Sequence, residues 1–245
     1  MLDYVILGII QGFFEWIPVS SEGIVALSSQ FLVKEVNPVE MALFLHLGTF
    51  FAVLLYFWKD WINVLKLKDL ALLRFLIIST IVSGVVGFGF YFLVKDIVVG
   101  SGLLLLTGFG LLITAFFHKS KKTFGIGFNK LPIIAGILQG LAVVPGLSRS
   151  GATIFGLSLG NLDPKLILKL SYMMSAPVVL AMAVFLGIEN PVLVSKSYPA
   201  LIFSFLAGLV SLRILLKFAE KINFFKFALI FSLLCFLGAG LEILI

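Results

Sequence analysis

The sequence has few charged residues: only 12% of its 245 residues are Asp, Glu, Lys or Arg, whereas 61% are hydrophobic. A water-soluble domain carries roughly a quarter charged residues, because its surface faces water. The mean hydropathy of +1.19 agrees with this shortage of charge. A water-soluble globular fold is therefore excluded, and we expect an integral membrane protein surrounded largely by lipid.

Cysteine is almost absent, and several motifs of soluble enzymes are missing. Cys235 is the one cysteine, so the chain forms no intrachain disulfide and no cysteine metal cluster. The sequence has no Walker A motif, HExxH, CxxC or dinucleotide fingerprint. These absences exclude the common motif-based forms of nucleotide binding, zinc hydrolysis and thiol redox chemistry.

Acidic residues are fewer than basic ones, which gives a net charge of +6. In a soluble protein such a balance can indicate nucleic-acid binding. Here the basic residues lie in short loops between apolar runs, which is typical of the positive-inside rule for membrane proteins. We therefore expect membrane lipids, and no nucleic acid, as partners.

The apolar runs fall into two classes by length. A helix needs about 20 apolar residues to cross a membrane, and six runs approach or exceed this length. Four shorter runs form two pairs, 4–33 and 131–162, each broken by Pro, Ser and a charge. Broken backbone at membrane depth has to be buried in protein or line a cavity, so we predict two re-entrant helix hairpins. The predicted spans are residues 41–58, 71–94, 100–117, 166–187, 198–216 and 224–245.

Loop charges distinguish the re-entrant hairpins from the alternative, in which each pair forms one long kinked spanning helix. With re-entrant pairs, 14 Lys and Arg residues fall in loops on one side and 3 on the other. If both pairs cross the membrane, the basic loops scatter over both sides. The re-entrant arrangement is favoured, and the positive-inside rule places the more basic side in the cytoplasm and both termini outside.

A repeated motif divides the chain into two halves, residues 1–128 and 129–245. Gly8-Ile-Ile-Gln11-Gly12 recurs as Gly136-Ile-Leu-Gln139-Gly140, 128 positions later, and a weaker match pairs residues 81–88 with 205–212. Each half has one hairpin and three spans, and because three is odd the second half is upside down. We predict an all-α integral membrane protein of two interlocked inverted-topology repeats, with a site near the bilayer midplane.

Polar residues gather at the break in each hairpin. Gln11 and Glu15 lie four apart, on one face of the first half-helix, and Pro18 ends that helix. Serines follow each break, where they favour the cap of the next half-helix. Arg149 lies at the tip of the second hairpin, where an arginine costs about 2.5–3.5 kcal/mol and needs a strong partner.

The two tips together predict an anion site. Two half-helix N-termini that face each other direct backbone N–H groups and dipoles at a common point, which favours an anion. The guanidinium of Arg149 grips phosphate bidentately, so phosphate or diphosphate is the predicted ligand. Two structural alternatives stay open: Arg149 pairs with Glu15 or Glu22, and the hairpin serines act as caps alone. His46 and His118 are interpreted as structural or interfacial residues.

Both tips resemble the membrane undecaprenyl-diphosphate phosphatases of the BacA type, and the resemblance covers essentially the whole chain. The first tip reads Glu15-Trp-Ile-Pro-Val-Ser20-Ser21, and residues 145–153 closely match the family's PGxSRSxxT signature. The resemblance implies hydrolysis of a C55-type polyprenyl diphosphate, which recycles the lipid carrier of cell-envelope glycan synthesis. It also implies a plasma-membrane site that opens to the external face and a divalent cation, Mg²⁺ or Ca²⁺.

The resemblance assigns catalytic roles to three residues: Glu15 in the paired-glutamate element, Ser21 as the proposed nucleophile and Arg149 on the diphosphate. Two positions depart from the family pattern. Gln11 stands in place of the first glutamate, and Ile24 in place of the motif histidine. Without that histidine, activation of the nucleophile would depend on Glu15, on another carboxylate or on a metal-bound water.

Further residues around the tips are predicted to bind substrate, while the metal ligands are left unassigned. Glu22 stands where the family usually has Thr and would add a carboxylate. A second hypothesis is a transporter or flippase that moves a polyprenyl phosphate without hydrolysis, since broken helices in inverted repeats are typical of transporters. A homodimer is also considered. The predicted substrate-binding residues are Gln11, Ser20, Glu22, Ser148, Ser150 and Thr153.

Overall fold

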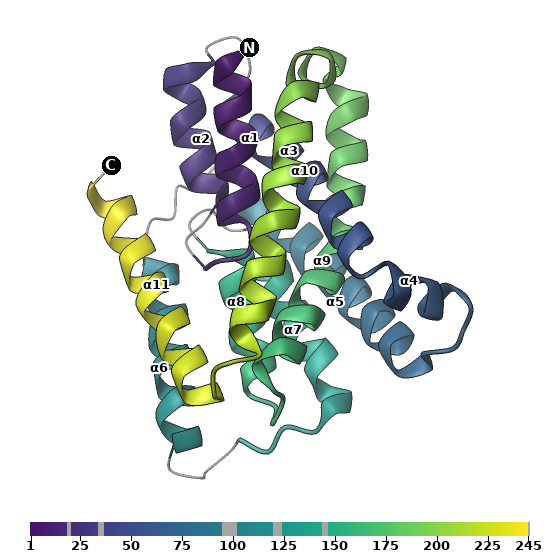
Figure 1. The fold of residues 1–245 in the computed structure, drawn as a ribbon, viewed down its shortest axis with the longest axis vertical. Coiled ribbons are helices and arrows are strands. Elements are labelled where there is room, and N and C mark those ends of the chain that lie inside the picture. The colour runs from purple at the N-terminus through teal and green to yellow at the C-terminus, as the bar shows by residue number, and fades with distance from the viewer. Residues whose placement is uncertain (19–20, 34–36, 95–101, 120–123, 144–146, 245) are drawn as a thin grey trace.

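The computed structural model describes residues 1–18, 21–33, 37–94, 102–119, 124–143 and 147–244. These residues are helical or in connections, and no strand occurs among them. The helices pack along one another in a bundle (Figure 1). They are α1 (Leu2–Phe14), α2 (Ser21–Leu32), α3 (Pro38–Tyr56), α4 (Trp58–Leu65), α5 (Leu70–Val94), α6 (Gly102–Lys119), the 3₁₀ turn η1 (Phe128–Lys130), α7 (Leu131–Leu141), α8 (Arg149–Ser158), α9 (Pro164–Glu189), α10 (Pro191–Ala219) and α11 (Phe224–Leu244).

The long apolar helices fit a protein that crosses the membrane several times. Within the described residues, α5, α9, α10 and α11 are each long and apolar enough to span, and the bent pair of α3 and α4 raises the number to five. Each of the six predicted spans overlaps one long helix: α3, α5, α6, α9, α10 or α11. Six crossings stay a prediction, because residues 100 and 101 of one predicted span lie outside the described residues.

Helix α10 begins earlier than the sequence predicted, at Pro191 instead of Tyr198. Asn190 caps the helix, since its side-chain oxygen accepts a hydrogen bond from Leu193 N at 3.1 Å. Pro191 suits the first turn because its missing N–H would have no partner there. A prediction from uncharged apolar runs starts this span after Lys196, because the charge is taken as a boundary. A lysine close to a helix end can nevertheless belong to the helix and extend its charge to the interface.

Helix α4 was not predicted, because most of it lies between the predicted spans 41–58 and 71–94. It meets α3 at a bend of 78°. Trp58 and Trp61 lie beside charged residues in this helix, a composition typical of the membrane interface. Lys169 Nζ donates to Asp60 Oδ1 at 2.7 Å, which ties α4 to α9.

The four short helices lie where the broken segments were predicted. Helix α1 ends at Phe14 and α2 begins at Ser21, with Pro18 between them. Helix α7 ends at Leu141 and α8 begins at Arg149. Ser148 caps α8, because its Oγ accepts a hydrogen bond from Gly151 N at 3.3 Å. The predicted breaks and the serine cap of the second segment are confirmed.

Glycines let α1 and α7 each cross a long helix of the other half of the chain at close range. A Cβ added to Gly12 of α1 would lie 2.5 Å from Gly208 N of α10, and α1 runs beside α10 in Figure 1. A Cβ added to Gly140 of α7 would lie 2.9 Å from Gly87 N of α5. Both glycines belong to the repeated motif, so the same local sequence makes the same kind of contact twice.

The glycine crossings align the long helices α5 and α10 of the two halves in a different register from the one that the weak sequence match predicts. Gly8 faces Ala200 O, and its counterpart Gly136 faces Ser79 O. Ala200 and Ser79 are 121 positions apart, whereas the match of residues 81–88 with 205–212 uses an offset of 124. The sequence match is displaced by three residues, close to one helical turn, because apolar helices match themselves almost equally well after one turn.

The same substitution at two glycines tests the close crossing. Gly12→Ala is expected to destabilise the protein by about 1–3 kcal/mol, because the new methyl group would meet backbone atoms of α10. Gly84 of α5 has no atom within 4 Å of an added Cβ, so Gly84→Ala should be neutral or stabilising by up to about 1 kcal/mol. Thermal unfolding of both variants in one detergent measures the difference. Equal shifts would contradict the crossing.

Candidate active site

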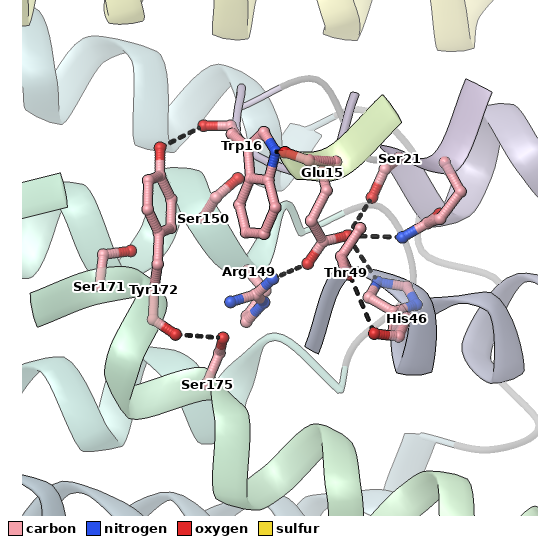
Figure 2. A network of polar contacts seen from close by, with 12 residues as sticks. Glu15, Trp16, Ser21, His46, Thr49, Arg149, Ser150, Ser171, Tyr172 and Ser175 are labelled. Atoms are coloured by element: carbon pink, nitrogen blue, oxygen red, sulfur yellow. Dashed lines mark hydrogen bonds and ion pairs between the residues drawn. The ribbon is translucent and has the colours of Figure 1, made fainter. Parts of the chain in front are cut away.

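The carboxylate of Glu15 lies at the centre of the polar residues of both broken segments (Figure 2). Arg149, the first residue of α8, forms an ion pair with Glu15 Oε1 through its Nη2. The Glu15 side chain is 2% exposed and that of Arg149 is 18% exposed. The pair joins the two broken segments and realises the alternative in which the arginine pairs with Glu15.

Three further partners surround the other carboxylate oxygen. Gln11 Nε2 donates to Glu15 Oε2 at 2.6 Å, and Ser21 Oγ donates to it at 3.2 Å. His46 Nε2 lies 3.1 Å from the same oxygen. Together with Arg149 on Oε1, these partners match the roughly four lone-pair sites of an ionised carboxylate. The buried carboxylate therefore has both its charge and its hydrogen bonds satisfied.

Two aromatic side chains hold the backbone that carries Glu15. The Trp16 indole N–H donates to Gly208 O at 2.9 Å and lies 3.0 Å from Ser211 Oγ, both on α10. Tyr172 OH donates to Trp16 O at 2.7 Å, and the two rings pack edge to face. Ser150 Oγ donates to Ile17 O at 3.1 Å. The first tip is thus attached to α8, α9 and α10, all in the second half of the chain.

A cavity of about 30 Å³ lies beside the carboxylate. The first residues of α2 and α8 line it, and the unpaired N–H groups and dipoles of helix N-termini favour an anion. Arg149 Nη1 is buried and has no hydrogen-bond partner among the described residues, so it can bind a further acceptor. The lining residues are Glu15, Ser21, Glu22, His46, Ala142, Leu147, Ser148, Arg149 and Ser150.

Most of the predicted site residues meet at this cavity, whereas Gln11 and Thr153 do not line it. Gln11 hydrogen-bonds Glu15 but is not among the residues that line the cavity. The Thr153 hydroxyl donates to Arg149 O at 2.9 Å and lies 2.6 Å from Ser171 Oγ, so it supports α8 from within the protein. Ser20 lies outside the described residues. The predicted residues that line the cavity are Glu15, Ser21, Glu22, Ser148, Arg149 and Ser150.

His46 is the site residue that the sequence interpretation missed. It lies on α3, and its imidazole contacts Glu15 and lines the cavity, so its interpretation as a structural or interfacial residue is wrong. The available signal was an ionisable side chain within a spanning run, which by default indicates a functional site. The contact itself depends on how α3 packs, and no local pattern encodes that. The side chain of His118 lies outside the described residues.

The residues at the site do not fit the divalent cation that the resemblance implies. Among the described residues, no three His, Cys, Asp or Glu side chains form a group that could hold a metal ion. Both oxygens of Glu15 are engaged by Arg149, Gln11 and other partners. Gln11 also offers a neutral amide where a second carboxylate is implied. No step of the reaction below is therefore assigned to a metal.

Known proteins resemble the chain over nearly its whole length. The family model described as bacitracin resistance protein BacA matches residues 4–237. A protein of Methanococcoides burtonii named undecaprenyl-diphosphatase is 32% identical, over 93% of this chain and 94% of its own length. Two relatives with the same name come from Haloarcula marismortui, 32% identical over 100% of this chain and 99% of its own, and Thermosipho africanus, 34% identical over 97% of both. The matched region includes both broken segments.

The ion pair between Glu15 and Arg149 predicts strong energetic coupling. Glu15→Gln and Arg149→Gln each leave one charge without its partner, which in a buried site costs up to about 3–5 kcal/mol. The double variant removes both charges, so its destabilisation should fall short of the sum of the single losses by at least about 1 kcal/mol. Unfolding free energies of the four proteins in mixed micelles complete the cycle. Additive losses would show that the two groups do not interact.

Proposed function

The chain belongs to the bacitracin resistance protein BacA family, and from this premise we propose that it hydrolyses undecaprenyl diphosphate to undecaprenyl phosphate and inorganic phosphate. The relatives named undecaprenyl-diphosphatase support this substrate. The observation that carries the proposal is that Ser21 and Arg149 contact the same buried carboxylate. A nucleophile, an acceptor for its proton and a cation for phosphate then surround one cavity.

Arg149 receives the diphosphate in this proposal. Its Nη1 is buried and has no partner within the described part of the chain, while Nη2 contacts Glu15. A guanidinium binds phosphate through two parallel N–H donors. The N-termini of α2 and α8 contribute backbone N–H groups, and Ser148 and Ser150 contribute hydroxyls at the same cavity.

Substrate binding has to open the cavity. Its volume of about 30 Å³ has room for a water molecule or two, which is too small for a diphosphate. We expect the diphosphate to draw Arg149 away from Glu15, because it carries more negative charge and presents more acceptors than one carboxylate. The ion pair of the free protein thus keeps both charges matched until substrate arrives.

Ser21 then attacks the terminal phosphorus. As the bond between Ser21 Oγ and phosphorus forms, the hydroxyl proton passes to Glu15 Oε2, and the bond from phosphorus to the polyprenyl phosphate oxygen breaks. Arg149 stabilises the charge that develops on the equatorial oxygens. A water molecule next attacks the phosphoserine, Ser21 Oγ regains its proton from Glu15, and inorganic phosphate leaves. The reaction returns the lipid carrier as a monophosphate for glycan synthesis in the cell envelope.

The arrangement of the chain in the plasma membrane is part of the same proposal. Residues 1–128 and 129–245 form inverted repeats that interlock through their re-entrant hairpins. In support, α1 of the first half crosses α10 of the second, and α7 of the second crosses α5 of the first, both at repeated glycines. In Figure 1 both termini and the α9–α10 junction lie in the upper half, and the α10–α11 junction lies lower. This placement supports termini on one side of the membrane, and the positive-inside rule makes that side the outside. The site is proposed to open to the same side.

A divalent cation and a homodimer stay predictions of the resemblance. Phosphate release during titration with a chelator, followed by Mg²⁺ or Ca²⁺, tests the cation. Light scattering of the purified protein in detergent tests the dimer.

Phosphate release from purified protein tests the activity. Wild type is expected to release phosphate from a polyprenyl diphosphate, and Arg149→Ala to lower kcat/KM by roughly 10²–10³-fold, because it removes the group that stabilises the transition-state charge. Glu15→Gln should lose activity to a similar extent. Ser21→Ala should abolish formation of the phosphoserine, and activity that survives in this variant would instead favour direct attack by a water that Glu15 activates.

The matched control is Arg74→Ala, which removes an exposed arginine at the start of α5 and should leave the rate unchanged.

Reconstitution into vesicles separates hydrolysis from transport. If wild type moved a polyprenyl phosphate across the bilayer but released no phosphate, the phosphatase proposal would be wrong.

Cysteine labelling tests the topology. In a Cys235→Ala background, Leu2→Cys should react with a membrane-impermeant maleimide on intact cells, because the N-terminus is proposed to face outward. Lys68→Cys should react only after the cells are permeabilised, since its loop belongs to the more basic side. Both native side chains are exposed. Labelling of the two positions from the same side would contradict the arrangement.

A further inference from the structure

Helix α3 brings an imidazole to the active site from outside the two motif segments. His46 Nε2 lies 3.1 Å from Glu15 Oε2, and the His46 side chain is 13% exposed (Figure 2). We propose that His46 is the positioning residue of the Glu15 carboxylate and takes the place of the motif histidine, which is Ile24 in this chain. The proposal rests on the proposed phosphatase function and names a residue on which the rate of that reaction depends.

The hydrogen bonds of His46 fix the orientation of its ring. Nδ1 lies 2.8 Å from Ala42 O, a backbone carbonyl that can only accept, so Nδ1 carries a hydrogen and donates. This bond to the preceding turn of α3 holds Nε2 toward Glu15. One proton then lies between Nε2 and Oε2, so the imidazole and the carboxylate as a pair can still take up the proton of Ser21. The imidazole and the carboxylate are joined as a pair, in the way that orienting partners hold catalytic groups.

The contact matters most after substrate binds. In the free protein Glu15 is held at Oε1 by Arg149 and at Oε2 by Gln11, Ser21 and His46. When the diphosphate takes Arg149 and Ser21 turns to phosphorus, two of these partners leave. Gln11 and His46 remain, from helices α1 and α3, and they keep Oε2 where it receives the serine proton.

No other described side chain is an imidazole that can take the place of the motif histidine. Ile24 follows Ser21 on α2, but an aliphatic side chain cannot hydrogen-bond a carboxylate. His46 is the one imidazole among the described side chains, and it lines the cavity together with Ser21 and Glu22. The chain therefore has a hydrogen-bonding ring at the site although the motif position has lost it.

Two substitutions separate positioning from packing. His46→Ala removes the contact to Glu15 and is expected to lower kcat by roughly 10–100-fold with little change in KM, because a misplaced proton acceptor slows the chemical step. His46→Gln keeps an N–H donor at about the reach of Nε2, so kcat should recover to within roughly fivefold of wild type. Thr49→Val is the control: this buried hydroxyl, one turn further along α3, donates only to His46 O.

The outcomes are distinct. Recovery in His46→Gln, with the Thr49→Val rate unchanged, supports positioning. Full kcat in His46→Ala, or equal loss of kcat in the Ala and Gln variants, overturns it.

If wild type releases no phosphate, the proposed function fails first, and the orientation of the His46 ring is then tested by a measurement that needs no activity. In the ¹⁵N spectrum of histidine-labelled wild type, the chain's two histidines are distinguished by the signals lost in His46→Gln, and His46 Nδ1 should be protonated. An unprotonated Nδ1 would contradict the proposed ring orientation.

Discussion

A carboxylate buried between helices has to have its charge matched and its lone pairs filled, and Glu15 meets both demands with partners from four segments. Gln11 belongs to α1, Ser21 to α2, His46 to α3 and Arg149 to α8. An ionised group without such partners would cost several kcal/mol in this environment. Both broken segments and the first long helix are therefore held in position by one side chain, which is also the proposed proton acceptor.

The backbone at the first tip also needs hydrogen-bond partners. A broken helix leaves carbonyl groups without donors from its own backbone, and lipid offers none. The second half of the chain supplies those donors. Tyr172 satisfies Trp16 O, Ser150 satisfies Ile17 O, and Ser211 satisfies Gly12 O. The break that makes the site accessible to a ligand is thus stabilised by side chains far away in sequence, and this dependence favours a single cooperative unit over two independent halves.

The sequence predicted whatever depends on local chemistry. The apolar runs indicated the long helices, and Pro18 and the serines indicated the breaks. The anion site indicated by an arginine between serines stays a prediction. Residues whose roles depend on packing were not predictable from one sequence. His46 became a site residue only once α3 was placed against the first tip. The bend before α4 was likewise missed, because the predicted span ends at residue 58 and composition alone does not show a change of direction.

The two departures from the family motif change the site together. A second glutamate at position 11, four residues before Glu15, would place two like charges on one helix face, and they would need a cation or a shared proton between them. Gln11 instead donates a hydrogen bond to Glu15, so the local repulsion is absent. A site with one such carboxylate needs less positive charge, and Arg149 supplies a positive charge from within the chain. Gln11 and the His46 imidazole add hydrogen-bonding groups at the same carboxylate, so the two departures from the motif leave Glu15 with partners from within the chain.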